Sequence, residues 1–76
     1  MSVIIYSTPT CHYCHRAKEY LKEKGVEFTD IDVSVDTVKA QEMVDKSGQM
    51  GVPVLDINGT LVIGFDKGKI DQLLGL

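Results

Sequence analysis

The N-terminal part of the chain alternates between strand and helix patterns. Residues 2–6 form a short apolar run rich in β-branched side chains, which predicts a buried strand. Residues 8–10 break this run. From about residue 11 to residue 24 the apolar positions share one helix face, and Gly25 is a typical C-terminal stop. Residues 26–33 alternate apolar and acidic side chains and predict a second strand, which a right-handed crossover would place parallel to the first.

A second helix is predicted in the middle of the chain. Either Ser34 or Asp36 can cap its start, and Gly48 can end it. At helical spacing between these limits lie the side chains of an inward face: Ala40, Met43, Val44 and Ser47. We interpret these side chains as the apolar face of the helix.

A hairpin and a short helix are predicted at the C-terminal end. Residues 52–57 and 60–63 are rich in strand formers and flank Asn58-Gly59, the strongest short-range signal for a two-residue turn. Asp66 can cap a last helix, whose inward side chains would be Ile70, Leu73 and Leu74. The order β-α-β-α-β-β-α has no linker or repeat, so we expect one α/β domain over residues 1–76.

Composition and charge narrow the class of protein. The 76 residues are 43% hydrophobic and 25% charged, as in an ordinary globular domain. The net charge of −3 argues against a nucleic-acid partner. The apolar run Val3-Ile4-Ile5 has no basic residue before it and is typical neither of a signal peptide nor of a membrane span. We therefore expect a monomeric cytoplasmic protein with no membrane partner.

Both cysteines of the chain lie in the pentapeptide Cys11-His12-Tyr13-Cys14-His15. This pattern fits three kinds of chemistry. C-x-x-C-H is the attachment signature of a c-type haem, C-x-x-C near a strand-helix-strand pattern is typical of a redox dithiol, and two further ligands would complete a zinc site. A purely structural disulfide across so short a loop would add only about 2 kcal/mol.

The position of the cysteines favours the redox dithiol on physical grounds. A cysteine just before the first turn of a helix faces unpaired backbone N–H groups and the positive end of the helix dipole, which stabilise a thiolate. Because the thiolate is the attacking species, Cys11 is the expected nucleophile. Cys14, one turn later on the inward face, is the expected resolving thiol.

Other uses of the cysteines are weaker but open. Covalent haem attachment requires an exported chain and a distal ligand such as Met43 or Met50. Zinc bound by the cysteines with His12 or His15 would need a second subunit, because the chain has no second cluster of Cys or His. The alternative function is thus a binding module that holds metal or an iron–sulfur cluster between two chains. Two inert buried cysteines are a further possibility.

Two segments together carry a family resemblance. "TPTCHYCHRAKEYLKEKGVEF" and "GVPVLDINGTLVIGFD" resemble the glutaredoxin family, whose usual site is C-P-Y-C followed by Lys or Arg and Ala, with a later X-Val-Pro loop. The resemblance covers the whole chain. It implies a thioredoxin fold with a four-stranded mixed sheet and three helices. It also implies a thiol–disulfide oxidoreductase with no tightly bound cofactor, acting on protein disulfides.

Basic side chains surround the predicted nucleophile. His12 stands where glutaredoxins usually carry Pro; it is either a solvated surface histidine or a cation that favours the Cys11 thiolate. His15 and Arg16 lie just inside the helix, where a cation opposes the dipole. We expect both to tune the ionisation of the thiol or to attract an anionic substrate.

The resemblance also implies a substrate-binding set: Tyr13, Val52, Pro53, Gly64 and Asp66. It implies a cis Val52-Pro53 bond beside the dithiol, with the Val52 backbone pairing to the substrate as an added strand would. Gly51 replaces the family's frequent Thr or Ser, which we expect to loosen this loop.

The glutathione site of the family is incomplete in this chain. Gly64 and Asp66 match it, whereas Thr8, Phe65 and Lys67 replace other expected groups, and Asp66 serves equally well as a helix cap. The Gly-Phe pair is similar to the small redoxins that feed ribonucleotide reductase. Glutathione is therefore a possible co-substrate, and a flavin disulfide reductase of the thioredoxin-reductase type is the expected electron donor. Phe65 would offer an apolar contact to such a protein partner.

Overall fold

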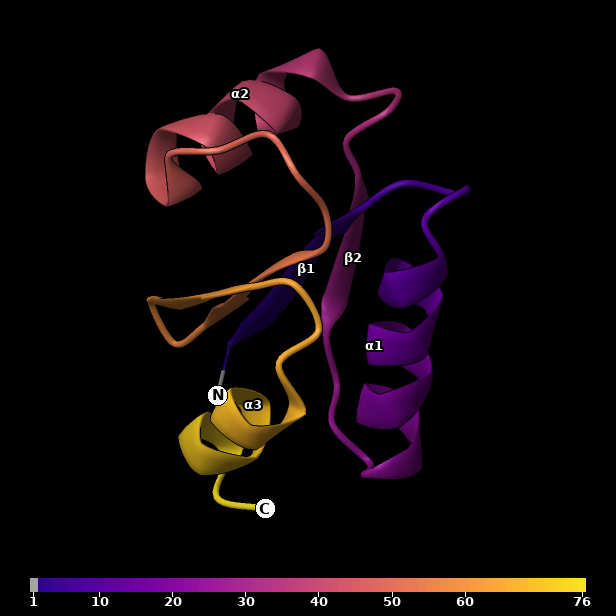
Figure 1. Cartoon of the computed structure of the whole chain (residues 1–76), viewed down its shortest axis with the longest axis vertical. Helices are drawn as coiled ribbons and strands as arrows, with labels where there is room; N and C mark the ends of the chain where they lie inside the picture. Colours follow the sequence, from indigo (N-terminus) through magenta and orange to yellow (C-terminus); the bar gives the residue numbers. More distant parts are fainter. Residues whose placement is uncertain (1) are drawn as a thin grey trace.

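The computed structural model describes residues 2–76, and the order of its elements confirms the predicted one (Figure 1). The elements are β1 (Val3–Ser7), α1 (His12–Glu23), β2 (Thr29–Asp32), α2 (Thr37–Ser47), β3 (Val54–Ile57), β4 (Thr60–Ile63) and α3 (Lys67–Leu74). The sheet has four strands in the order β2-β1-β3-β4. β1 and β2 are parallel, whereas the β1–β3 and β3–β4 pairs are antiparallel. This is the mixed sheet of the thioredoxin fold.

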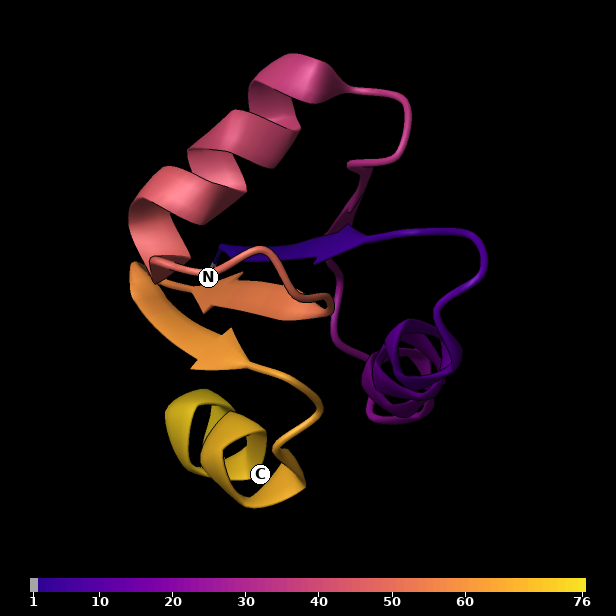
Figure 2. The same ribbon diagram turned by 45° about the horizontal axis from the view of Figure 1, so that its top comes forward.

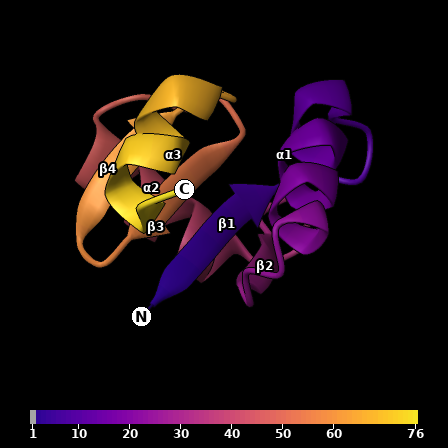
Figure 3. The same cartoon turned by 90° about the horizontal axis from the view of Figure 1, so that it is seen from below.

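The helices form layers on both sides of the sheet. Figure 2 shows α2 above the sheet with α1 and α3 below it, and Figure 3 gives the same grouping from a second direction. Alternate side chains of each strand face opposite layers. In β1, for example, Ile5 points to α1 and α3, while Tyr6 points to α2. Within residues 2–76, no helix has the length and apolar character that crossing a membrane requires.

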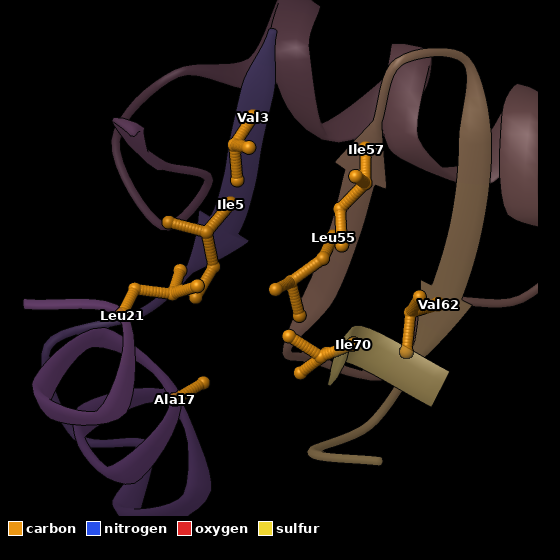
Figure 4. Close-up of a cluster of buried hydrophobic side chains, with 8 residues drawn as sticks. All are labelled: Val3, Ile5, Ala17, Leu21, Leu55, Ile57, Val62 and Ile70. Carbon is orange, nitrogen blue, oxygen red and sulfur yellow. The ribbon is translucent and has the colours of Figure 1, made fainter. Parts of the chain in front are cut away.

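The larger core lies between the sheet and the pair α1 and α3. Its side chains come from three strands and two helices and meet in one cluster (Figure 4): Val3, Ile5, Ala17, Leu21, Leu55, Ile57, Val62 and Ile70. The α2 face buries a smaller cluster of Tyr6, Met43 and Val54. α1 is therefore fixed to the sheet by the larger apolar contact.

Several predicted caps and turns are confirmed. Asp36 and Asp66 cap α2 and α3 by accepting from backbone N–H groups one turn later (3.0 and 3.2 Å). Ser34 is not a cap; its hydroxyl and N–H donate to Asp32 instead. Asn58 and Gly59 have positive φ values of 52° and 92°, as a two-residue hairpin turn of the expected type requires.

The predicted second strand was too long. Residues 26–28 and Val33 are not in β2. At the start, the Val26 N–H donates to the Leu21 carbonyl (2.9 Å) and the Gly25 N–H to the Lys22 carbonyl (3.1 Å). These two bonds close the C-terminus of α1 and remove Val26 from the sheet. The third strand likewise begins at Val54 rather than at residue 52, after the proline that lacks a donor.

Candidate active site

Cys11 is the N-cap of α1. Its backbone is extended (φ −81°, ψ 113°), and its Sγ accepts a hydrogen bond from the Cys14 N–H at 3.1 Å. A cap sulfur in this position receives one of the otherwise unpaired N–H groups of the first turn. The residue is partly exposed.

Cys14 occupies the opposite environment within the same turn. Its side chain is completely buried, and both cysteines are free thiols. Burial, together with the hydrogen bond to Cys11, raises the pKa of Cys14 to about 12, against the opposing effects of the Thr8 backbone and the Lys18 charge. Cys14 is therefore a neutral thiol at neutral pH.

A polar cluster lies one turn farther along α1. The Lys18 ammonium is 3.1 Å from Asp30 Oδ2 in β2, and the hydroxyl of the buried Ser7 donates to Asp30 Oδ1 at 2.7 Å. Partial burial opposes ionisation of Asp30, but the bonds from Ser7 and Lys18 outweigh it and lower the pKa of this carboxyl. The cluster ties α1 to the sheet at the end of β1.

The three basic side chains near Cys11 have different environments. His12 is exposed and lies edge-on to the Tyr13 ring, with 6.4 Å between centroids. His15 Nε2 donates to the Pro9 carbonyl at 2.9 Å, so this nitrogen binds the loop before the helix. Arg16 is exposed to solvent. Tyr13 is 60% exposed and available to a binding partner.

The Val52-Pro53 loop is hydrogen-bonded to Gly64, another residue of the predicted substrate-binding set. The Val52-Pro53 peptide bond is cis, as the resemblance implied. The Gly64 N–H donates to the Pro53 carbonyl at 2.8 Å, and Gly64 itself has a φ of 80° that favours glycine. The structure thus brings the loop before β3 and the loop after β4 together.

The segment after Gly64 is turned toward α1. The Phe65 ring is half-buried and packs on the Tyr20 ring with 5.8 Å between centroids, so part of its apolar surface is used within the molecule. The Tyr20 hydroxyl donates to Asp71, and Lys67 lies over the Tyr20 ring at 5.3 Å. The hydrogen bond to Asp71, with partial burial, raises the pKa of Tyr20 to about 12. Both Phe65 and Lys67 therefore serve the contact between α1 and α3.

Sequence reasoning missed Gln49. Its side chain makes two hydrogen bonds to the backbone of Gly51, in the loop that was expected to be loosened by that glycine. The signal was indirect, namely a glycine where the family frequently has Thr or Ser. Among residues 2–76, no three His, Cys, Asp or Glu side chains converge as a metal site would need.

Comparison with known proteins gives consistent matches. Residues 3–62 match the family model described as Glutaredoxin. The chain is 49% identical over 70 residues to an uncharacterized glutaredoxin-like 8.6 kDa protein in the rubredoxin operon of Clostridium pasteurianum, covering 92% of this chain and 93% of that one. It is 38% identical over 80 residues to glutaredoxin 3 of Escherichia coli K12, covering 96% of each. Among solved structures, NrdH-redoxin of Escherichia coli has a TM-score of 0.82 at 27% identity, covering 96% of this chain and 95% of that one.

Proposed function

The chain belongs to the glutaredoxin family of thiol–disulfide oxidoreductases, and from this premise we propose that it reduces protein and mixed disulfides through Cys11 and Cys14. The observation that carries the proposal is the contrast between the two sulfurs. Cys11 is partly exposed and its Sγ accepts a hydrogen bond from the Cys14 N–H at 3.1 Å, whereas Cys14 is buried and protonated. Cys11 is thus the thiol that would attack the substrate, and Cys14 is the thiol that would resolve the mixed disulfide.

The reaction divides into two exchanges. The Cys11 thiolate attacks one sulfur of the substrate disulfide, forms a mixed disulfide and releases the other substrate sulfur as a thiolate that takes up a proton. Cys14 then loses its proton, attacks Cys11 Sγ and releases the second substrate thiol. The substrate disulfide gains two electrons and two protons, and the protein is oxidised to a Cys11–Cys14 disulfide. Val52 would pair its backbone with the substrate during the first exchange.

Replacing each cysteine separately tests this assignment. Cys11→Ser should abolish reduction of a peptide disulfide, because no exposed thiolate remains. Cys14→Ser should instead accumulate a covalent adduct with the substrate, visible by mass spectrometry and released by dithiothreitol. Activity retained in Cys11→Ser, or an adduct on Cys14 in the wild-type protein, would contradict this division of roles between the two thiols.

We further propose that a flavin disulfide reductase is a better electron donor than glutathione. Three observations support this. Thr8 supplies no cation for a glutathione carboxylate, the Asp66 carboxylate already caps α3, and Lys67 pairs with Asp71 at 3.6 Å. Each charge-assisted hydrogen bond that glutathione loses weakens binding by about 1.5 to 3 kcal/mol. NrdH-redoxin of Escherichia coli is itself described as a glutaredoxin-like protein with a thioredoxin-like activity profile.

The donor is tested with both reducing couples on one preparation. NADPH with thioredoxin reductase and NADPH with glutathione and glutathione reductase are offered to the oxidised protein at matched concentration, and NADPH loss is followed. We expect faster reduction with the first couple. Thr8→Lys provides the matched variant, because it restores one cation for a glutathione carboxylate. It should raise the rate with the glutathione couple and leave the rate with the thioredoxin reductase couple unchanged. A wild-type protein reduced faster by glutathione would overturn this choice of donor.

A further inference from the structure

The loop between α2 and β3 is held by a glutamine that binds the backbone of Gly51. Gln49 Nε2 donates to the Gly51 carbonyl at 2.9 Å, and the Gly51 N–H donates to Gln49 Oε1 at 2.6 Å. One carboxamide therefore satisfies both backbone groups of one residue, as a neighbouring antiparallel strand does. We refer to this pair of bonds as the Gln49 clamp.

The clamp determines where the next peptide group points. In a trans peptide unit, the C=O of one residue and the N–H of the next point in opposite directions. The Gly51–Val52 bond is trans, and the cis bond found within residues 2–76 is the following one, Val52-Pro53. Because the Gly51 carbonyl faces Gln49, the Val52 N–H is directed away from the clamp.

Both neighbours of Val52 are anchored while its own backbone is free. On one side, the Ser47 hydroxyl at the end of α2 accepts from the Gln49 N–H at 3.4 Å. On the other side, the Pro53 carbonyl accepts from the Gly64 N–H at 2.8 Å. Within residues 2–76, no loop hydrogen bond uses the N–H or the C=O of Val52. The loop thus presents one unpaired residue between two fixed points.

The Gln49 carboxamide lies in the space that a side chain at position 51 would enter. A Cβ placed on Gly51 would lie 2.6 Å from Gln49 Oε1, closer than such contacts occur in proteins. Any other side chain at this position must therefore shift the carboxamide, which we expect to weaken its two bonds to Gly51. Gly51 and Gln49 therefore form a matched pair, and the glycine adds a restraint to the loop instead of removing one.

We propose that Gln49 is a positioning residue for disulfide substrates that carry a peptide backbone. Its carboxamide holds Gly51 so that the free N–H and C=O of Val52 pair with the substrate chain next to its disulfide. Gln49 itself contacts no reacting atom. The proposal rests on the proposed function, because it requires that the first exchange occurs at Cys11 with the substrate lying along Val52.

The test compares two oxidised substrates in single turnover with the reduced protein. One is a peptide that contains an intermolecular disulfide, and the other is bis(2-hydroxyethyl) disulfide, which has no peptide backbone. Gln49→Ala should slow the reaction with the peptide about 3- to 10-fold, the effect expected from one misplaced hydrogen-bonding residue. The rate with the small disulfide should stay within about twofold. Gln41→Ala, on the exposed side of α2, is the matched control.

A second variant tests the pairing of the two residues. Gly51→Thr should slow the peptide reaction by a similar factor in the wild-type background and have little further effect in Gln49→Ala, because the clamp is already absent. Hydrogen exchange at the Gly51 amide should accelerate in Gln49→Ala while the sheet amides stay protected, which shows that the variant is folded.

The outcomes separate the two proposals. A wild-type protein that reduces both disulfides, with Gln49→Ala slowing both equally or neither, would overturn the positioning role alone. Additive effects of Gln49→Ala and Gly51→Thr would overturn it as well. A wild-type protein that reduces neither disulfide would overturn the proposed function, and the role of the clamp with it.

Discussion

On the face covered by α1 and α3, eight buried side chains form one apolar cluster, whereas three do so on the face covered by α2. The α2 face adds polar contacts instead. The Tyr6 hydroxyl donates to Glu42 and accepts from Lys46, both at 3.3 Å, and Lys46 also reaches Asp56 at 3.2 Å. The hydrogen bonds to Tyr6 and Asp56 raise the pKa of Lys46. Polar contacts therefore make up a larger share of the packing of α2 on the sheet than of α1, whose polar contact with the sheet is the cluster of Lys18, Asp30 and Ser7.

The two parts of the candidate active site lie next to different helix layers. Cys11 and Cys14 are carried by α1, on the apolar face, while the loop with Val52 follows α2, on the polar face. Apolar burial is insensitive to moderate salt, but partly exposed ion pairs are screened by it. We infer that the packing of α1, which carries the dithiol, responds little to salt, and that the packing of α2, which precedes the Val52 loop, responds more.

The largest effect is expected from the apolar face. Leu21→Ala removes a completely buried side chain from the α1 core and should lower the free energy of unfolding by about 3 to 5 kcal/mol. Urea unfolding measures the loss. Val38→Ala, at a position that is 76% exposed, serves as the control and should change the midpoint little. A loss below about 2 kcal/mol would contradict the dominant role of this face.

Truncating a buried side chain on the α2 face should lower the free energy of unfolding by a smaller amount. Met43→Ala removes a side chain that is 2% exposed, but its surroundings are half-buried and can relax into the space, so we expect about 2 kcal/mol. The same urea experiment measures it. Reduction of bis(2-hydroxyethyl) disulfide by the folded variant should stay unchanged, because α1 does not rest on Met43. A cost equal to that of Leu21→Ala would remove the distinction between the faces.

The polar contacts of the α2 face can be tested without changing its packing. Tyr6→Phe keeps the buried ring but removes the hydroxyl between Glu42 and Lys46, which should cost about 1 kcal/mol. The loss should shrink as salt is added, since the lost contact involves charged partners. Identical stability of the two proteins at low salt would show that apolar burial alone holds α2.

Local chemistry explains which parts of the structure were predictable. The cap at Asp66 and the turn at Asn58-Gly59 follow from backbone preferences of single residues, so the sequence was sufficient for them. For α2 the sequence narrowed the cap to Ser34 or Asp36, and the structure selects Asp36. The start of β2 was not predictable, because Val26 has the side chain of a strand former while its backbone N–H is bonded to the end of α1. An apolar residue has the same pattern whether it packs from a strand or from a loop.

The candidate active site also has features that could be predicted from the sequence and features that could not. The contrast between Cys11 and Cys14 was expected from helix geometry, and their exposure agrees with it. The Gln49 clamp was not expected, because a side chain that binds backbone two residues away leaves no periodic signal. The direction of Phe65 depends on Tyr20 in a distant part of the chain, which only the tertiary structure brings into contact.

The smallest predicted effect concerns the polar cluster beside α1. The bonds from Ser7 and Lys18 lower the pKa of Asp30, so its ionised form stabilises the folded state. This contribution is complete above the unfolded aspartate pKa of about 4 and is lost as the pH falls through the lower folded value. Asp30→Asn should cost about 0.5 kcal/mol at pH 7, as for a partly exposed ion pair. The difference in free energy of unfolding between the two proteins, measured with urea, should vanish in acid. A difference that grows in acid would mean that folding raises the pKa of Asp30.

The contact between Tyr20, Phe65 and Asp71 also gives the protein an internal optical reporter. The chain has no Trp, three Tyr and two Phe, so its ultraviolet emission is dominated by tyrosine. Each tyrosine lies in a different region: Tyr6 is buried against α2, Tyr13 is exposed beside the dithiol, and Tyr20 lies between α1 and α3. A carboxylate hydrogen-bonded to a phenol quenches its fluorescence. Release of Tyr20 from Asp71 should therefore brighten the emission, and single Tyr→Phe variants would show when α3 separates from α1 without any added dye.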